Sequence, residues 1–580
     1  NLSELFSLEC WGGATFDSSM RFQKENPWDR LHKLNENAPN ILKQMLLRGA
    51  NAVGYKNYPD NVVRYFVKES AKAGIDVFRI FDSLNIIENM EVAIEEVRNS
   101  NKICEGAICY TNDVNDPKEQ KYTLRYYIGL VKSLEKLGVN IIAIKDMAGL
   151  CKPEAIRLLI REIRNISNLP IHFHTHDTSG TSAASVLTAI DEGVDIVDLA
   201  MDSMSGLTSQ PALGSIANII NSNQKNNNLD GTHIRSASLY WEEVRQNYNA
   251  FESDFKGGSS DVYLHQMPGG QFTNLKEQAR SLGISTSKWG MVANMYAEVN
   301  KMFGDIIKVT PSSKIVGDMA LYMIANDLSV EDVTNPDKDI IFPSSVIEFF
   351  RGELGIPIGG FPPVLQKKIL GLQKPLTQRP GKTLKPINIE DEKNNLEKII
   401  NQSVSNQDLA SYLMYPNVFI DFVNFQKKFS DTSILPTSLF FYGPNIDQEY
   451  SLTIDAGKNL IIRFLAKGEV NVNGFCSIFF ELNGQPRTID VEDRSFSKTK
   501  INKPVVDINN LNHLGSPLPG QVSQLFVKNQ DKIIKGDKVL IIEAMKMETI
   551  ITAHKSGKIK NLQVEIGTNL NPKDLLLEID

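Results

Sequence analysis

Two histidines, two residues apart, are the first candidates for chemistry in this chain. His174 and His176 lie in the apolar run Pro170–His176, which is typical of a β-strand. Because side chains two apart on a strand point to the same face, both imidazoles face one side of the predicted sheet. Two imidazoles at a strand end form part of a typical metal site. A pair of hydrogen-bonded core histidines is the alternative, but the Asp-Thr-Ser-Gly that follows favours metal.

A lysine at the end of another apolar strand could serve the same metal. Lys145 ends the run Ile141–Lys145, where burial of an ammonium group is costly unless it is paired or modified. A salt bridge with Asp146 or Asp177 would pair it. Addition of carbon dioxide to the neutral amine would instead give a carbamate, which is an anionic oxygen ligand for a metal. The residues alone leave both roles open.

Near the C-terminus, another lysine has the surroundings of a covalent attachment site. Lys546 stands between two methionines in the run Glu543–Glu548, at the turn of a predicted hairpin. Two similar segments, which begin at Gly520 and Gly557, alternate apolar and polar residues and predict the halves of a β-sandwich. An ordinary surface lysine is the alternative. Together these features resemble the biotinyl (biotin carboxyl carrier) domain of biotin-dependent carboxylases, which implies biotin on Lys546.

Alternating strands and helices would position the histidines and Lys145. Seven short apolar runs alternate with amphipathic segments up to about residue 215. This βα repeat favours an α/β fold of the (β/α)8 TIM-barrel type over an open doubly wound sheet, and no Gly-rich phosphate loop follows the first run. A barrel needs eight strands, so we expect the missing first strand to precede residue 1. The runs are Leu5–Trp11, Gln44–Arg48, Asp76–Phe81, Gly106–Thr111, Asn140–Lys145, Pro170–His176 and Val194–Ala200.

Polar residues follow several of these predicted strands. The active sites of barrels gather at the C-terminal ends of the strands, so this edge is the expected site. The polar strand ends are Asp17, Arg48, Asp82, Asn85, Lys145, Asp146, His174, His176, Asp177 and Asp202.

Composition narrows the class of protein. With 580 residues, the chain is expected to form about three or four domains. A net charge of −7 gives no reason to expect nucleic acid, and the five cysteines lack metal-binding spacing and predict reduced thiols. No run approaches the ~20 apolar residues of a membrane span. No targeting signal is visible, so a cytoplasmic location is expected, or a mitochondrial matrix in a eukaryote.

Six stretches of the chain closely resemble the carboxyltransferase domain of pyruvate carboxylases. The resemblance implies a divalent metal, Mn, Mg or Zn, bound by His174, His176 and carbamylated Lys145. It also implies that Arg48 holds the carboxylate of pyruvate. The stretches are Leu5–Asp17, Met45–Tyr55, Ile144–Gly149, His174–Gly180, Asp202–Pro211 and Lys308–Lys314.

Three further residues have roles that rest mainly on this resemblance. Asp17 and Tyr55 are expected to line the pyruvate pocket. Thr310 is expected to relay a proton between the methyl group of pyruvate and a ring nitrogen of biotin, since a hydroxyl both donates and accepts. On its own, Val-Thr-Pro-Ser-Ser would equally predict a helix N-cap turn. In the family, an Asp on the first barrel strand is a metal ligand, and that stretch is absent here; we expect the chain to be cut from a longer protein.

Four domains are predicted. They are a carboxyltransferase barrel at 1–295, a helical funnel extension at 296–375, a small α+β tethering and tetramerisation domain at 376–505 and a β-sandwich carrier at 510–580. The predicted reaction moves a carboxyl group from carboxybiotin to pyruvate, forming oxaloacetate. ATP would act only through a biotin carboxylase part outside this chain. A biotin protein ligase and a homotetramer are the other expected partners.

Two other functions stay open at this point. One is the α subunit of an oxaloacetate decarboxylase or a transcarboxylase, which shares the barrel and the carrier. The other is a non-catalytic biotin carrier and assembly subunit, supported only by the missing strand. The segment at about 387–500 favours pyruvate carboxylase, because its resemblance is to that family.

Overall fold

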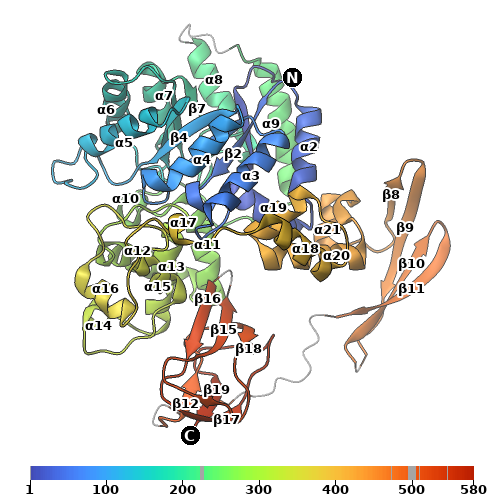
Figure 1. Ribbon diagram of the computed structural model, residues 1–580. Helices are drawn as coiled ribbons and strands as arrows, with labels where there is room; N and C mark the ends of the chain where they lie inside the picture. The colour runs from blue at the N-terminus through green and yellow to red at the C-terminus, as the bar shows by residue number, and fades with distance from the viewer. Residues whose placement is uncertain (1, 223–227, 472, 494–503, 508–509, 545–546) are drawn as a thin grey trace. The chain divides into compact units, whose positions relative to one another are not determined.

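The computed structural model describes residues 2–580 except 223–227, 472, 494–503, 508–509 and 545–546 (Figure 1). Contacts within the chain define two compact units. One comprises Asn1–Asp17, Pro27–Pro416 and Val505–Asp580, and the other comprises Ser18–Asn26 and Asn417–Pro504.

A seven-stranded parallel sheet dominates the first unit, and its strands pair in chain order. Strands buried on both faces are mainly apolar rather than alternating: all six residues of Ile141–Asp146 are buried, and the first four are apolar. The register places Lys145 beside His174 on the next strand. The predicted barrel-type sheet of seven strands is confirmed. The strands are β1 (Ser7–Gly12), β2 (Leu42–Leu47), β3 (Val77–Ile80), β4 (Ile103–Cys109), β5 (Ile141–Asp146), β6 (Ile171–Thr175) and β7 (Ile196–Val197).

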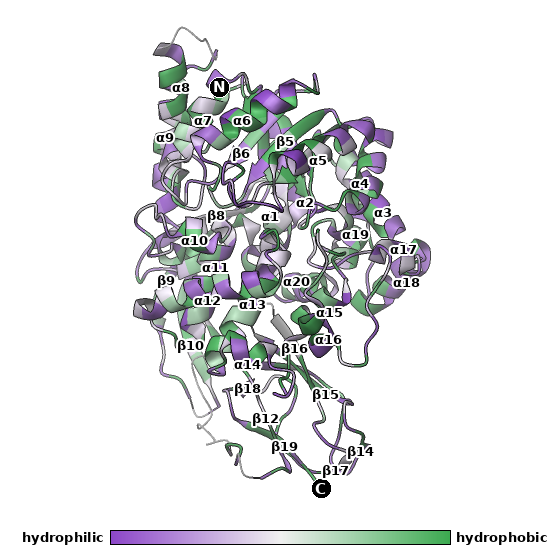
Figure 2. Ribbon diagram, turned by 90° about the vertical axis from the view of Figure 1, so that its left-hand side faces the viewer, coloured by the Kyte–Doolittle hydropathy of each residue, from purple (hydrophilic) through white to green (hydrophobic). Residues whose placement is uncertain are grey.

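Amphipathic helices alternate with these strands. On α6, Ile156, Leu159 and Ile163 are buried, whereas Arg161 is exposed, so one face packs inward. Figure 2 shows the resulting mixture of green and purple residues on the barrel helices. Each aliphatic side chain buried in this way contributes about 1.5–3 kcal/mol. The helices are α1 (Gly13–Ser18), α2 (Pro27–Asn37), α3 (Asp60–Lys72), α4 (Ile87–Asn99), α5 (Leu124–Lys136), α6 (Pro153–Arg164), α7 (Ser182–Asp191), α8 (Leu213–Ser222) and α9 (Gly231–Gln246).

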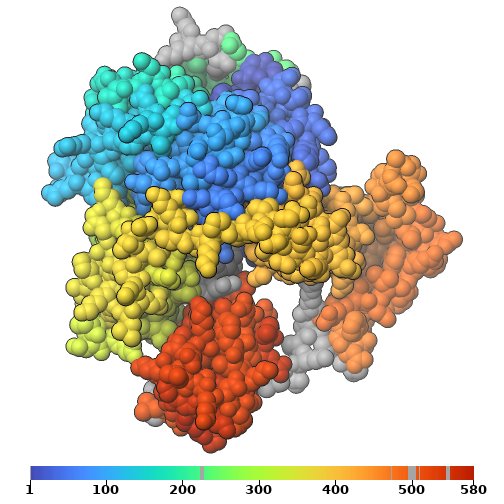
Figure 3. Space-filling model, in the orientation of Figure 1, coloured from blue at the N-terminus to red at the C-terminus, as the bar shows by residue number. Residues whose placement is uncertain are grey.

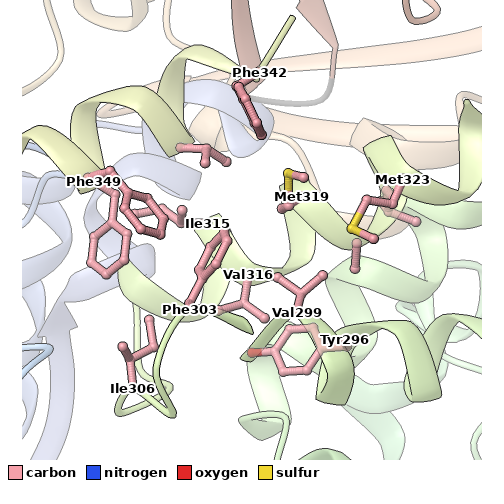
Figure 4. Packing of buried hydrophobic residues seen from close by; sticks show 14 of the residues in the cluster. Tyr296, Val299, Phe303, Ile306, Ile315, Val316, Met319, Met323, Phe342 and Phe349 are labelled. Carbon is pink, nitrogen blue, oxygen red and sulfur yellow. The ribbon is translucent and has the colours of Figure 1, made fainter. Parts of the chain in front are cut away.

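A helical extension follows the barrel and has its own apolar core. Phe303, Val316, Met319 and Phe349 are fully buried in this core, where side chains from different helices pack against one another (Figure 4). A helical extension after the barrel was predicted; its apolar core includes Met267 and Phe272, so the predicted start of the funnel at residue 296 falls within the helix Trp289–Met302 rather than between helices. Its helices are α10 (Val262–His265), α11 (Gly269–Ser281), α12 (Trp289–Met302), α13 (Ser312–Ala325), α14 (Val330–Thr334), α15 (Ser344–Arg351) and α16 (Pro363–Leu370).

The segment after the extension packs along the barrel, as the gold band beside the blue barrel in Figure 3 shows. Arg379 forms an ion pair with Asp60, and Trp28 Nε1 donates to Ser411 Oγ at 2.9 Å. These contacts tie residues far apart in sequence to the barrel helices. The segment contains α17 (Pro380–Thr383), α18 (Ile389–Ile400) and α19 (Asn406–Met414).

The second unit contains helices and a four-stranded antiparallel sheet, in the order β11-β10-β9-β8. Leu452 and Cys476 are buried in the sheet, while much of β11 is exposed. This is the small α+β fold predicted for the tethering region. Its elements are α20 (Pro416–Phe429), α21 (Thr437–Tyr442), β8 (Glu449–Asp455), β9 (Lys458–Lys467), β10 (Phe475–Leu482) and β11 (Gln485–Glu492).

The C-terminal residues form a sandwich of two four-stranded sheets, β12-β19-β17-β14 and β16-β15-β13-β18. The two predicted half-repeats start strands in different sheets, as two-fold symmetry requires. Lys546 lies outside the described residues, but β15 and β16 pair as the predicted hairpin up to Ala544 and Met547. The strands are β12 (His513–Gly515), β13 (Gly520–Leu525), β14 (Lys532–Ile533), β15 (Lys538–Ala544), β16 (Met547–Thr552), β17 (Gly557–Leu562), β18 (Asn569–Leu570) and β19 (Leu575–Ile579).

None of the helices in the described parts of the chain has the length and apolar character needed to span a bilayer.

Candidate active site

The two predicted metal-binding histidines face each other at the C-terminal end of β6. His174 Nε2 and His176 Nε2 lie 3.1 Å apart. The Nδ1 of His174 bonds to Asp198 Oδ2 at 2.7 Å, and the Nδ1 of His176 bonds to the Thr208 carbonyl at 2.6 Å. A carbonyl only accepts, so His176 Nδ1 carries the proton. Arg79 Nη1 lies 3.2 Å from His174 Nδ1, but the carboxylate oxygen of Asp198 is closer and favours a proton on this nitrogen too. Both Nε2 atoms therefore present lone pairs to the same point.

Burial keeps both imidazoles neutral. It lowers the pKa of His176 to about 4 and that of His174 well below its usual range, and the charge of Lys145 acts in the same direction. Neutral imidazole is the form that binds metals. Two lone pairs 3.1 Å apart repel each other unless a cation lies between them. The donor set thus fits a metal ion.

Lys145 lies beside His174 on the neighbouring strand. It is buried, and its Nζ lies 5.4 Å from the centre of the Phe81 ring. Burial lowers the pKa of Lys145, which favours the neutral amine. Among the residues that the structure describes, no three His, Cys, Asp or Glu side chains are grouped as a metal site. Carbamylated Lys145 as a third ligand stays a prediction.

A buried network of charges, which sequence reasoning missed, lies beside the histidines in the sheet. Arg79 is fully buried and bonds to Glu105, to Glu9 at 2.7 Å and to Asp198 at 2.5 Å. His172 bridges Glu105 and Asp198, at 2.9 Å from each. Burial alone would lower the pKa of His172, but the two carboxylates outweigh it and raise the pKa to about 9.

The network holds Asp198, and Asp198 in turn orients His174. Arg79 and His172 hold the pKa of Asp198 well below its usual range, although burial opposes them. One signal could have found part of this network. Arg79 and Glu105 are charged residues within apolar strands, as Lys145 is, and the same argument about the cost of burial applies to them.

The predicted carboxylate-binding arginine lies after β2 and is buried. Arg48 is 4% exposed, and its Nη1 donates to the carbonyls of Val53 and Gly54. Its Nε is buried without a hydrogen-bond partner among the described residues. The Tyr55 ring lies 5.2 Å from the guanidinium carbon. A buried N–H without an acceptor is costly, and the carboxylate of a ligand would satisfy it.

Asp17 lies in the same buried region as Arg48. It is fully buried in α1, and its negative charge acts on the hydroxyls of Tyr58 and Tyr415, as does the positive charge of Arg48. The structure brings Arg48 and Tyr55 together, and Asp17 acts on the tyrosines beside them; their role in binding pyruvate stays a prediction. Tyr58 and Tyr415 are neighbours of this group that sequence reasoning missed.

Thr310 lies in the loop before α13. The helix begins at Ser312 with Pro311 in the N-cap position and no side-chain capping bond, so Thr310 does not cap it. Ser312 Oγ anchors the loop by bonding to the carbonyls of Ile307 and Val309, at 2.7 Å each. The proton-relay role of Thr310 stays a prediction.

Comparisons with known proteins match three family models along the chain. They are an HMGL-like model over residues 63–240, a conserved carboxylase domain over 262–463 and a biotin-requiring enzyme model over 512–579. The order of these three matches along the chain agrees with the order of the barrel, the helical extension with the tethering region, and the carrier.

A solved structure decides the family. The carboxyl transferase domain of Rhizobium etli pyruvate carboxylase, solved with pyruvate and biocytin, is 55% identical to this chain with a TM-score of 0.82. The alignment covers 85% of this chain and 83% of that domain. The chain belongs to the pyruvate carboxylase family. Pyruvate carboxylases of Bacillus subtilis and of Mus musculus mitochondria are 46% and 44% identical to it over its whole length.

As a member of this family, the chain spans about half the length of its curated relatives, 50% of the Bacillus protein and 49% of the mouse protein. It likewise covers 48% of a complete multifunctional pyruvate carboxylase from Rhizobium etli. These matches do not favour the decarboxylase, transcarboxylase or non-catalytic alternatives.

Proposed function

We propose that this chain transfers a carboxyl group from carboxybiotin on Lys546 to pyruvate, forming oxaloacetate. The observation that carries the proposal is the buried Arg48 guanidinium, whose Nε has no partner among the described residues. Its planar fork suits a carboxylate better than a lysine would. Asp17 and Tyr55 would line the binding pocket around Arg48 and would limit the substrate to a small carboxylate.

The proposed metal ligands are His174, His176 and carbamylated Lys145. The convergent Nε2 atoms and the buried amine support this assignment. When bound, a divalent ion (Mn, Mg or Zn) would polarise the carbonyl of pyruvate so that its enolate forms at lower cost. Asp198 and Thr208 would hold the imidazoles in the binding tautomer. Thr310 would pass a proton between the methyl group of pyruvate and the biotin ring.

The remaining partners follow from the family and the half-length coverage. A biotin protein ligase would attach biotin to Lys546, and a biotin carboxylase part or subunit would carboxylate it with ATP. The tethering region, proposed to span 376–505, would help to form a homotetramer. We also propose these domain bounds: the barrel spans residues 1–295, the funnel 296–375 and the carrier 510–580. Cytoplasm is the proposed compartment, or the mitochondrial matrix in a eukaryote.

Replacement of Arg48 tests the proposal. We expect Arg48→Lys to lower kcat/KM for pyruvate by about 100-fold, because bonds to charged groups contribute about 1.5–3 kcal/mol. Oxaloacetate formation would be measured with ATP and bicarbonate in the full-length protein. Arg64→Lys is the matched control, since Arg64 pairs with Glu95 and Glu96 on the outer side of the barrel. Equal kcat/KM values for the two variants would refute the role of Arg48.

A separate experiment tests the carrier. An avidin blot of the Lys546→Arg variant should lose the biotinylated band that the unmodified protein shows. Retention of the band would place the biotin elsewhere and remove the basis for carboxybiotin on Lys546.

A further inference from the structure

The loop that carries Arg48 is held by a segment more than 350 residues later, through two reciprocal tyrosine hydrogen bonds. The Tyr58 hydroxyl in the loop donates to the Met414 carbonyl at 2.6 Å. The Tyr415 hydroxyl in the segment donates to the Val53 carbonyl in the loop, also at 2.6 Å. Both tyrosines are buried. Each side of the contact therefore satisfies a carbonyl of the other.

The Val53 carbonyl is shared between Tyr415 and Arg48. Arg48 Nη1 donates to the same oxygen, so one acceptor fixes both groups. The Tyr415 ring also meets the Tyr55 ring edge-on, with centroids 6.4 Å apart at 68°. Tyr55 is the ring that lies next to the Arg48 guanidinium. Tyr415 thus contacts two of the groups that lie against the guanidinium, the Val53 carbonyl and the Tyr55 ring.

We propose that Tyr415, at the junction of α19 and α20, is a positioning residue for Arg48 and builds one wall of the substrate-carboxylate pocket. This inference rests on the proposed role of Arg48. A guanidinium that binds a carboxylate through two parallel bonds must be held in plane, and small displacements weaken such recognition strongly. The chain segment that leads from the barrel to the tethering domain therefore contributes directly to the affinity for substrate.

The electrostatics of Tyr415 agree with a donor role rather than with acid–base chemistry. Burial raises the pKa of Tyr415 well above its usual range, and Tyr55 and Asp17 add to the effect while Arg48 opposes it. The hydroxyl stays protonated and donates at all working pH values. Tyr415 also stacks on Phe16, with centroids 6.3 Å apart, so the ring has a packing role besides.

The variant Tyr415→Phe separates these two roles, because it keeps the ring and removes only the hydroxyl. We expect it to raise KM for pyruvate about five- to tenfold, as the loss of one hydrogen bond predicts, with kcat changed less than twofold. Tyr65→Phe is the matched control. The Tyr65 hydroxyl donates to the Asn406 carbonyl of α19 at 3.1 Å, so it holds the same segment without contacting the Arg48 loop.

The outcomes separate failure of this inference from failure of the proposed function. A raised KM in Tyr415→Phe with an unchanged KM in Tyr65→Phe supports positioning. The same KM in both variants overturns the inference, even if Arg48→Lys still lowers kcat/KM. If Arg48→Lys also leaves kcat/KM for pyruvate unchanged, the proposed function itself fails. Tyr415→Phe could lower Tm more than Tyr65→Phe does. In that case the inhibition constant of oxamate is measured for both variants at a temperature below their unfolding transitions. Equal inhibition constants likewise overturn the inference.

Discussion

At the scale of single residues, the site depends on groups that do not touch the reacting atoms. Asp198 holds His174 through Nδ1, and Arg79 holds Asp198. A carboxylate behind a metal-binding imidazole fixes its tautomer and raises its basicity. The network therefore decides which nitrogen of His174 is available, although none of its carboxylates is a predicted ligand.

Replacement of Asp198 should weaken metal binding. We expect Asp198→Asn to reduce the affinity for Mn²⁺ about 10- to 100-fold, the usual cost of losing such a partner. The dissociation constant would be measured by competition with a chelator. Asp195→Asn is a suitable control, since Asp195 lies just before β7, is exposed and pairs with the half-buried Arg164. Equal affinities in the two variants would show that Asp198 does not orient a metal ligand.

Loss of the central cation of the network should affect stability. In Arg79→Met, Glu9, Glu105 and Asp198 lose their shared partner, and breaking a buried pair in this way costs about 3–5 kcal/mol. Urea unfolding would show a lower midpoint than that of the unmodified protein. Arg157→Met, which removes a more exposed partner of Glu192, should leave the midpoint close to that of the unmodified protein, because solvent-exposed ion pairs contribute little to stability.

At the scale of elements, the junction between α10 and α11 packs closely on the histidine pair. The Gly269 amide donates to the Met147 carbonyl at 2.9 Å, and a Cβ on Gly269 would come within 2.9 Å of His176 Nδ1. Only glycine lets α11 begin this close to the site. His265, which ends α10, accepts a bond from the Met267 amide at 3.0 Å and fixes the turn.

His265 should make stability depend on pH. Burial lowers its pKa from 6.5 to about 4, so the folded state disfavours the charged ring. The contribution of neutral His265 to the free energy of unfolding is complete above pH 6.5. It is lost as the pH falls towards 4, by about 3 kcal/mol in total. We expect His265→Asn, which keeps an acceptor for the Met267 amide, to show a shallower loss of unfolding free energy between these pH values. Parallel pH profiles for the two proteins would contradict this assignment.

At the scale of the whole molecule, the carrier has an apolar core that it builds from its own residues. Val522, Leu540, Ile559 and Leu577 are among the buried side chains of this core. The half-repeats supply two sheets that cover each other, so the domain does not need the barrel to bury its apolar surface. A domain of this kind can fold separately from the catalytic part.

The isolated carrier should therefore fold and accept biotin. We expect residues 505–580, expressed alone, to melt cooperatively and to be biotinylated by a biotin protein ligase. Circular dichroism and an avidin blot would measure these properties. Leu540→Asp, which places a charge in the core, should abolish the transition, whereas Lys546→Arg should preserve it and abolish only the biotin signal. A non-cooperative melt of the unmodified fragment would show that the carrier needs the rest of the chain.

The sequence by itself was enough to predict the seven strands, the pairing of His174 with His176 and the hairpin around Lys546. These features depend on local periodicity, because side-chain direction repeats every two residues along a strand. Asp17, Arg48 and Tyr55 were assigned to one pocket only by family resemblance. Their assembly depends on which loops meet in space.

Only the tertiary structure showed the partners that hold these groups. Arg79 and Asp198 are 119 residues apart, and Val53 and Tyr415 are 362 apart. Periodicity predicts which way a side chain points but not which distant chain segment it meets, since that is decided by strand register and by the packing of helices on the barrel. The candidate ligands could thus be proposed from the sequence, whereas the groups that orient them could not.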